Sequence, residues 1–100
     1  MPRMPRSIKL LPLARTDLED IWLYTFNTWS LDQADSYIRE ITATFEALAG
    51  RTKKGRNIDF VRQGYFRLTV GSHAIFYRSG HDDIEVVRIL HRRMDVDRHL

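Results

Sequence analysis

Cysteine is absent from this chain of 100 residues, and proline and glycine are scarce, with three and five copies. Without cysteine the chain can form neither a disulfide framework nor a thiolate metal site, which fits a reducing cytoplasm, and we expect a cytoplasmic protein. No apolar run approaches the roughly 18 residues that a membrane-spanning helix needs, so we expect no membrane segment. Residues 1–10 also lack the apolar core of a signal peptide. The repeated Met-Pro-Arg at residues 1–6 leaves Met1 and Met4 open as the start.

The composition, 43% hydrophobic and 29% charged, is that of an ordinary globular chain, and we expect one domain over residues 1–100. The charge is divided unevenly. Residues 1–50 hold five Lys/Arg and seven Asp/Glu, a net −2, whereas residues 51–100 hold eleven and six, a net +5. A basic half favours an acidic protein, a nucleic acid or a ribosomal surface as partner, although a face that only aids solubility remains open.

Three consecutive strands are predicted between residues 65 and 91. Tyr65–Val70 alternates apolar and polar side chains with the period of two that a half-buried strand shows. Gly71 and Ser72 supply a tight turn, and His73–Arg78 returns along the first strand. After a polar turn, Ile84–Leu90 is rich in β-branched residues, which suits an interior strand.

The N-terminal half predicts a short strand followed by two helices. Ser7–Ala14 contains Pro12, which cannot donate to a ladder, so we expect an edge strand or one that ends near Leu11. Thr16 and Glu19 have the spacing of a capping box, which predicts a first helix from Asp17 to about Thr28.

The second helix is predicted to follow almost without a loop, which makes a helical hairpin. Ser30 and Gln33 repeat the capping-box spacing, and Gly50 is the expected residue just past the helix end. Apolar residues recur at steps of three and four along one face of this helix, which we expect to be core: Ala34, Ile38, Ile41, Phe45 and Leu48.

The remaining segments are predicted to be irregular. We expect residues 1–6 to be disordered and residues 92–100 to form a short C-terminal turn or tail. Residues 51–64 are a basic loop that Ile58, Phe60 and Val61 should hold against the domain. The element order is then β-α-α-β-β-β, an α+β fold with a helical hairpin packed on a small, mostly antiparallel sheet.

Three segments resemble the RelE/ParE superfamily of bacterial toxins: TDLEDIW (16–22), GYFRLTVGSHAIFYR (64–78) and EVVRILHRRMD (85–95). The resemblance runs from Ile8 to Leu100, and the last segment is similar to the ParE branch in particular. It implies the toxin of a toxin–antitoxin module. ParE-type members inhibit DNA gyrase by trapping it on cleaved DNA, whereas RelE-type members cut messenger RNA in the ribosomal A site. A small cognate antitoxin neutralises either type.

The resemblance therefore implies a ParE-like gyrase inhibitor that forms a hetero-oligomer with its antitoxin, needs no cofactor and does not bind nucleic acid by itself. A ribosome-dependent endonuclease is the alternative, and an inactive interaction domain is a third. For the nuclease, the candidate residues are Arg67, His73, Arg88 and His91. Arg67 and His73 could equally line a solvated face, and Arg88 could be paired with Glu46 or Glu85.

Two binding surfaces are predicted beside this set. For the target, the candidate contacts are Arg67, His91, Arg92, Arg93 and Arg98, each of which could instead be a plain solvent charge. The first helix has more aromatic surface than one buried stripe can use, so we expect an antitoxin surface. Its candidate residues, together with the edge of the final strand, are Leu11, Leu13, Trp22, Tyr24, Phe26 and Trp29. Core packing explains Trp22 equally well. The four histidines are too scattered for a zinc site.

Overall fold

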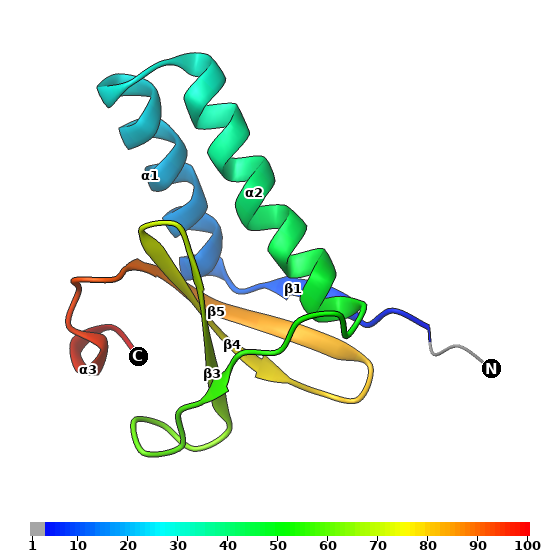
Figure 1. Cartoon of the computed structure of the whole chain (residues 1–100). Helices are drawn as coiled ribbons and strands as arrows, with labels where there is room; N and C mark the ends of the chain where they lie inside the picture. Colours follow the sequence, from blue (N-terminus) through cyan, green and yellow to red (C-terminus); the bar gives the residue numbers. More distant parts are fainter. Residues whose placement is uncertain (1–3) are drawn as a thin grey trace.

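The structure, a computed structural model, describes residues 4–100 and has two long helices above one sheet (Figure 1). Its elements are β1 Ser7–Leu10, α1 Pro12–Thr28, α2 Leu31–Ala49, β2 Arg56–Asn57, β3 Tyr65–Val70, β4 His73–Ser79, β5 Asp83–His91 and α3 Val96–His99. The strands form one sheet in the order β1-β5-β4-β3-β2, in which β1 runs parallel to β5 and the other pairs are antiparallel. This confirms the α+β fold and the mostly antiparallel sheet.

The predicted meander is present. β3 and β4 pair from Tyr65 opposite Arg78 to Val70 opposite His73, so Gly71 and Ser72 are the two turn residues. Gly71 has φ +54°, a left-handed conformation that glycine adopts without strain. β5 lies between β1 and β4, as expected for an interior strand. The sequence prediction missed β2, which has only two residues.

The start of α1 differs from the prediction. The helix begins at Pro12 rather than Asp17, with Leu11 as its N-cap, so Pro12 belongs to the helix and not to the strand. Proline suits this position because the first turn of a helix has no acceptor for its N–H groups. Thr16 is no cap, since its hydroxyl lies within the helix and donates to the Pro12 carbonyl (3.2 Å). β1 ends at Leu10, close to the expected end.

The predicted start of α2 is confirmed, because the Gln33 N–H donates to the Ser30 hydroxyl at 3.0 Å. Its apolar stripe is buried at four positions and partly buried at Ile38. The helix ends at Ala49 and Gly50 follows, but Gly50 keeps an ordinary φ of −79°. The left-handed residue is Arg51, with φ +63°.

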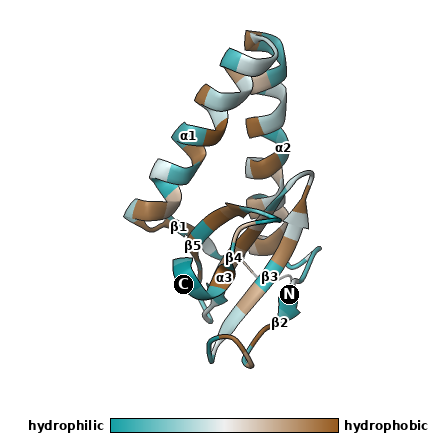
Figure 2. Cartoon of the chain, turned by 90° about the vertical axis from the view of Figure 1, so that its left-hand side faces the viewer, coloured by the Kyte–Doolittle hydropathy of each residue, from teal (hydrophilic) through white to brown (hydrophobic). Residues whose placement is uncertain are grey.

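Two apolar cores cover the two faces of the sheet. The larger lies between the helices and the sheet, where β4 and β5 carry much of the brown colour below the helices in Figure 2. The smaller lies on the far face, where Val96 and Leu100 pack on Phe76, Leu90 and neighbouring residues. Ile58 and Val61 hold the basic loop against this second core, as expected. Phe60 does not, since it is 81% exposed.

The described parts of both terminal segments make defined contacts. Residues 1–3 of the expected disordered segment 1–6 lie outside the described residues. Arg6, in contrast, is held by hydrogen bonds from its backbone N–H to the Ala49 carbonyl (3.1 Å) and from its guanidinium to the Leu48 carbonyl (2.6 Å). The C-terminal segment forms a turn and then the short helix α3. Across residues 4–100, none of the helices is both long and apolar enough to span a membrane.

Candidate functional site

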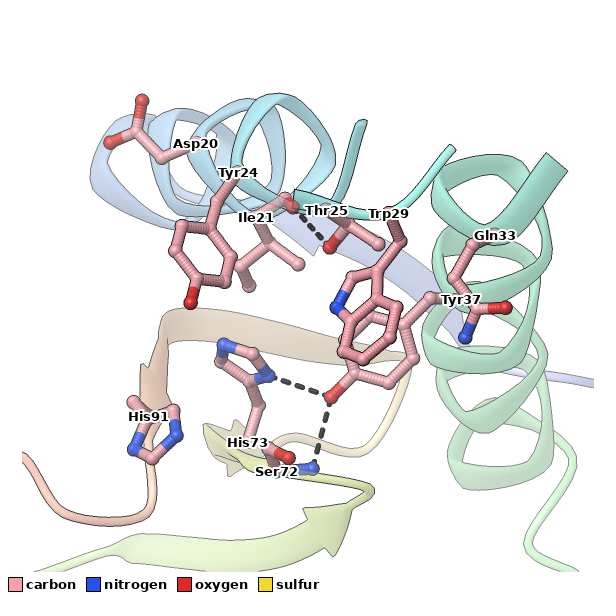
Figure 3. Close-up of a pocket in the computed structure, with 10 residues that line it drawn as sticks. All are labelled: Asp20, Ile21, Tyr24, Thr25, Trp29, Gln33, Tyr37, Ser72, His73 and His91. Carbon is pink, nitrogen blue, oxygen red and sulfur yellow. Dashed lines mark hydrogen bonds between the residues drawn. The ribbon is translucent and has the colours of Figure 1, made fainter. Parts of the chain in front are cut away.

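A cavity of about 540 Å³ lies in a groove between the helical hairpin and the end of the sheet at which β4 begins and β5 ends (Figure 3). This size is typical of ligand sites, and half of the lining residues carry aromatic or imidazole rings. The lining residues are Asp20, Ile21, Tyr24, Thr25, Trp29, Gln33, Tyr37, Ser72, His73 and His91. We refer to this cavity as the hairpin groove.

Tyr37 joins α2 to the β3–β4 turn at the floor of the hairpin groove. Its hydroxyl lies 2.6 Å from Nδ1 of His73, donates to the Val70 carbonyl (3.2 Å) and accepts from the Ser72 N–H (3.1 Å). A Cβ atom at Gly71 would lie 2.8 Å from the Tyr37 ring, so only glycine fits beneath it. Burial raises the pKa of Tyr37, so the hydroxyl keeps its proton.

His73 and His91 are neighbours across β4 and β5. The ring centroids are 5.4 Å apart, in an edge-to-face arrangement. Burial and the adjacent His91 lower the pKa of His73, and Asp17 opposes this only in part, so His73 is neutral near pH 7. The groove therefore places a neutral imidazole beside a phenol, with the carboxylate of Asp20 on its rim.

The upper part of the hairpin extends beyond the sheet (Figure 1), so the aromatic side chains near its tip have no strand to cover them. Trp29 is 73% exposed and Tyr24 69% exposed, and both open onto the hairpin groove (Figure 3). Trp22 is half-buried, stacks on Phe26 with centroids 5.3 Å apart, and donates to the Asp35 carboxylate (2.9 Å).

The six residues expected at the antitoxin surface therefore divide into two groups. Tyr24, Phe26, Trp29 and Leu13 are exposed, whereas Trp22 and Leu11 are partly buried. Trp22 is partly covered by its contacts within the hairpin, with the Phe26 ring and the Asp35 carboxylate, which agrees with the alternative that it serves packing. Leu23 and Leu31 are further exposed apolar residues on the hairpin.

The four candidate nuclease residues are not brought together. His73 and His91 meet in the groove, but Arg67 lies over the Phe76 ring on the opposite face of the sheet, with its guanidinium carbon 5.9 Å from the ring centroid. Arg88 is bound by Asp17 through two hydrogen bonds of 2.8 and 2.9 Å. A phosphate beside the two imidazoles would therefore lack these two arginines.

The partner of Arg88 is thus neither Glu46 nor Glu85, the two carboxylates that the sequence suggested. Asp17 also accepts from the Ile89 N–H (2.9 Å), on the edge of β5 beyond the end of β1. Hydrogen bonding to Asp17 raises the pKa of Arg88, and the two side chains are only 15% and 12% exposed.

Of the four arginines expected at the target surface, three are exposed at the C-terminal end, whereas Arg67 is partly buried in β3. Arg92 and Arg93 follow β5 directly, and Arg98 lies in α3, 3.6 Å from Asp95. His91 is also exposed, and it faces the hairpin groove. Among residues 4–100, no group of three or more His, Asp or Glu side chains could hold a metal ion.

Sequence reasoning missed Tyr37, although the signal was present. It lies three residues after Ala34 and four before Ile41, so it belongs to the same helical face as the buried stripe. A phenol on such a face needs a hydrogen-bond partner. No local signal identified Asp17 as the partner of Arg88. With the helix predicted to start at Asp17, its carboxylate was already explained by the favourable interaction of acidic residues with the helix dipole.

Comparison with known proteins identifies the family. The protein-family model described as "ParE toxin of type II toxin-antitoxin system, parDE" matches residues 8–96 of the sequence. This chain belongs to the ParE toxin family. It is 47% identical to Toxin ParE1 of Mycobacterium tuberculosis (strain CDC 1551 / Oshkosh) over 92 residues, which cover 91% of this chain and 94% of that toxin. It is 41% identical to Toxin ParE1 of Caulobacter vibrioides over 95 residues, or 95% and 98% of the two chains.

Solved structures support the same fold. A chain of the chromosomal ParDE toxin–antitoxin system from P. aeruginosa matches with a TM-score of 0.74 at 20% identity, covering 86% of this chain and 95% of that one. A chain of the RelBE2 toxin–antitoxin complex from Mycobacterium tuberculosis matches with a TM-score of 0.55 at 18% identity, covering 89% and 100%. At these identities the likeness concerns the fold. This ParE family chain therefore shares its fold, a helical hairpin on a sheet, with both solved structures.

Proposed function

We propose that this ParE family toxin inhibits DNA gyrase by direct binding, through the cationic C-terminal end of the sheet. The observation that carries the proposal is the exposure of Arg92, Arg93 and Arg98 beyond β5, where a partner can reach all three. His91 lies at the base of this end, and Arg67 lies on the face of the sheet that carries α3. Exposed cations steer association with acidic surfaces and contribute to specificity.

The test is gyrase supercoiling with purified chain, scored both for loss of supercoiling and for cleaved DNA complexes. We expect inhibition by the wild-type chain and a weaker effect of the double variant Arg92→Gln/Arg93→Gln. The matched control is Arg15→Gln/Arg39→Gln, which removes the same charge from exposed positions on the two helices. Equal inhibition by both variants would show that the C-terminal end is not part of the interface. Unaffected supercoiling with the wild-type chain would refute gyrase as the target.

A RelE-like nuclease is the second candidate, because His73 and His91 are adjacent in the hairpin groove. General acid–base cleavage of RNA also needs cations at the phosphate, and the arginines that could supply them, Arg67 and Arg88, lie elsewhere. We therefore expect no cleavage of ribosome-bound message in a parallel assay. Cleavage that is lost in His73→Gln would favour the nuclease.

The family relationship also supports a cognate antitoxin, and we infer that it covers the hairpin groove. Tyr24 and Trp29 are exposed aromatic side chains beside a cavity, which is the arrangement that receives the apolar face of a partner helix. The partner to test is the product of the adjacent reading frame, by co-purification and affinity measurement.

In that measurement Tyr24→Ala/Trp29→Ala should weaken binding by roughly tenfold or more, since buried aromatic anchors dominate interface energies. Phe60→Ala is the matched control, because Phe60 is an exposed aromatic residue in the loop between β2 and β3. That loop lies at the opposite end of the molecule from the hairpin tip (Figure 1). If the antitoxin binds the double variant as tightly as the control, the groove is not its site.

A further inference from the structure

A second pocket, of about 290 Å³, lies where the N-terminal segment, the loop after α2 and the end of β4 come together. It is at the opposite end of β4 from His73 and the hairpin groove. The lining residues are Arg6, Arg51, Lys53, Lys54, Phe66, Tyr77 and Ser79. Four of these seven are cationic, and none of the lining residues in the described chain is a carboxylate.

The pocket is built by hydrogen bonds rather than by loose surface side chains. The N–H of Gly55 donates to the Tyr77 hydroxyl at 2.6 Å, which brings the loop onto the sheet. Glycine is required there, because a Cβ atom would lie 2.7 Å from the Arg67 carbonyl oxygen and 2.8 Å from the Tyr77 hydroxyl. The N–H groups of Thr52 and Lys53 also donate to the Ala47 carbonyl, at 2.9 and 3.2 Å. The backbone that carries the two lysines is therefore fixed.

Some of the polar groups around this pocket are donors that have no acceptor among the described residues, namely the hydroxyls of Tyr77 and Ser79, Nε of Arg6 and the ammonium groups of Lys53 and Lys54. Tyr77 and Ser79 each accept one hydrogen bond, from the loop backbone and from Arg6, and each keeps an O–H to donate. Burial raises the pKa of Tyr77, so its hydroxyl retains the proton. Nε of Arg6 is buried without a hydrogen-bond partner among the described residues. Lys53 and Lys54 are exposed and form no ion pair within residues 4–100.

We propose that this pocket binds a tetrahedral oxyanion, the phosphate group of a small ligand. An anion would offset the repulsion among the cations and accept from the free hydroxyl and ammonium donors at once. Donors from the loop, from β4 and from the N-terminal segment approach from several directions, which matches the four oxygens of phosphate better than the two of a carboxylate.

Two sources could supply that phosphate group, namely free inorganic phosphate and a nucleotide. The rings of Phe66 and Tyr77 stack with centroids 5.5 Å apart and form an apolar wall beside the cations. The ring of Phe66 is only partly buried, so a nucleobase could pack against it. The pocket lies apart from the hairpin groove and from the cationic C-terminal end, so its test is independent of the gyrase and antitoxin assignments.

The experiment titrates the full chain with inorganic phosphate at constant ionic strength and follows the amide resonances of Gly55 and its neighbours by NMR. We expect saturable shifts in the wild type. In Lys53→Gln/Lys54→Gln, Kd should rise roughly tenfold or more, because two charge-assisted contacts are lost. The control Arg92→Gln/Arg93→Gln removes the same charge at the other end of the sheet and should change Kd less than about twofold.

Uridine 5′-monophosphate and acetate complete the design. Binding of the nucleotide at least about tenfold tighter than phosphate assigns the pocket to a nucleotide, and equal affinity assigns it to free phosphate. Acetate should bind more weakly than either. The proposal is overturned if the shifts grow linearly without saturation, if acetate binds as tightly as phosphate, or if the two double variants have the same Kd.

Discussion

Removing the carboxylate of Asp17 is the most informative perturbation of this fold. Asp17 receives two hydrogen bonds from the Arg88 guanidinium and a third from the Ile89 N–H, all between 2.8 and 2.9 Å. It thereby joins the first turns of α1 to the edge of β5 where β1 has ended. In Asp17→Ala, a nearly buried guanidinium and an edge N–H both lose their acceptor.

The size of the effect follows from burial. Breaking a buried ion pair by removing one partner costs about 3–5 kcal/mol, because an uncompensated charge remains. Arg88 keeps some solvent contact and a hydrogen bond to the His99 carbonyl (3.3 Å), which places the expected loss near the lower value, about 3 kcal/mol. With an m-value of about 1–2 kcal/mol/M, the urea midpoint should fall by roughly 1.5–3 M.

The assay is equilibrium urea unfolding of the purified chain, with Glu85→Ala as the control. Glu85 pairs with Arg78 on the surface, where the two side chains are 26% and 50% exposed, and such pairs contribute about 0–1 kcal/mol. The double variant Asp17→Ala/Arg88→Met should recover at least about 1 kcal/mol relative to Asp17→Ala, since no unpaired charge is left. If Asp17→Ala destabilises the chain no more than Glu85→Ala does, the reasoning is refuted.

Three further outcomes are expected in the same unfolding assay. Tyr37→Phe should lower the free energy of unfolding by about 1–3 kcal/mol, because the Ser72 N–H and His73 lose a hydrogen-bond partner. The control Tyr24→Phe changes an exposed side chain and should leave stability unchanged, and equal effects of the two variants would contradict the prediction. The pKa of His73 is lowered in the folded chain, so the unfolded chain binds more protons and stability should fall as pH drops below about 6.5. His73→Gln should flatten that pH dependence, and an unchanged profile would argue against it. Ser30→Ala should cost about 1 kcal/mol through loss of the α2 cap, and no loss would mean that the cap is dispensable.

The first helix illustrates how a correct element can have a wrong start. Proline is tolerated both on an edge strand and at the first position of a helix, because neither place needs its missing N–H. The capping-box spacing of Thr16 and Glu19 then favoured the later start. The tertiary structure fixes the position, since the Leu11 N–H still donates to the Val86 carbonyl of β5 (3.0 Å) and the helix begins at the next residue, Pro12.

For the candidate site, part of the answer was available from the hairpin register. A two-residue turn at Gly71 and Ser72 sets His73 opposite Val70, on the face that packs against the helices. Arg67 is three residues before Val70, so alternation places it on the other face. The separation of Arg67 from His73 could thus have been predicted. It would have followed that the four candidate nuclease residues do not form one site.

By itself, the sequence determined the helical hairpin, the three-stranded meander, the buried stripe of α2 and the family, because these depend on neighbours two to four residues apart and on matching segments. Only the tertiary structure decided that Asp17 meets Arg88 and that Tyr37 meets His73. It also brought Arg6, Lys53 and Tyr77 to one pocket. The physical reason is that such contacts depend on sheet order and on where the helices lie across the sheet, which no local periodicity specifies.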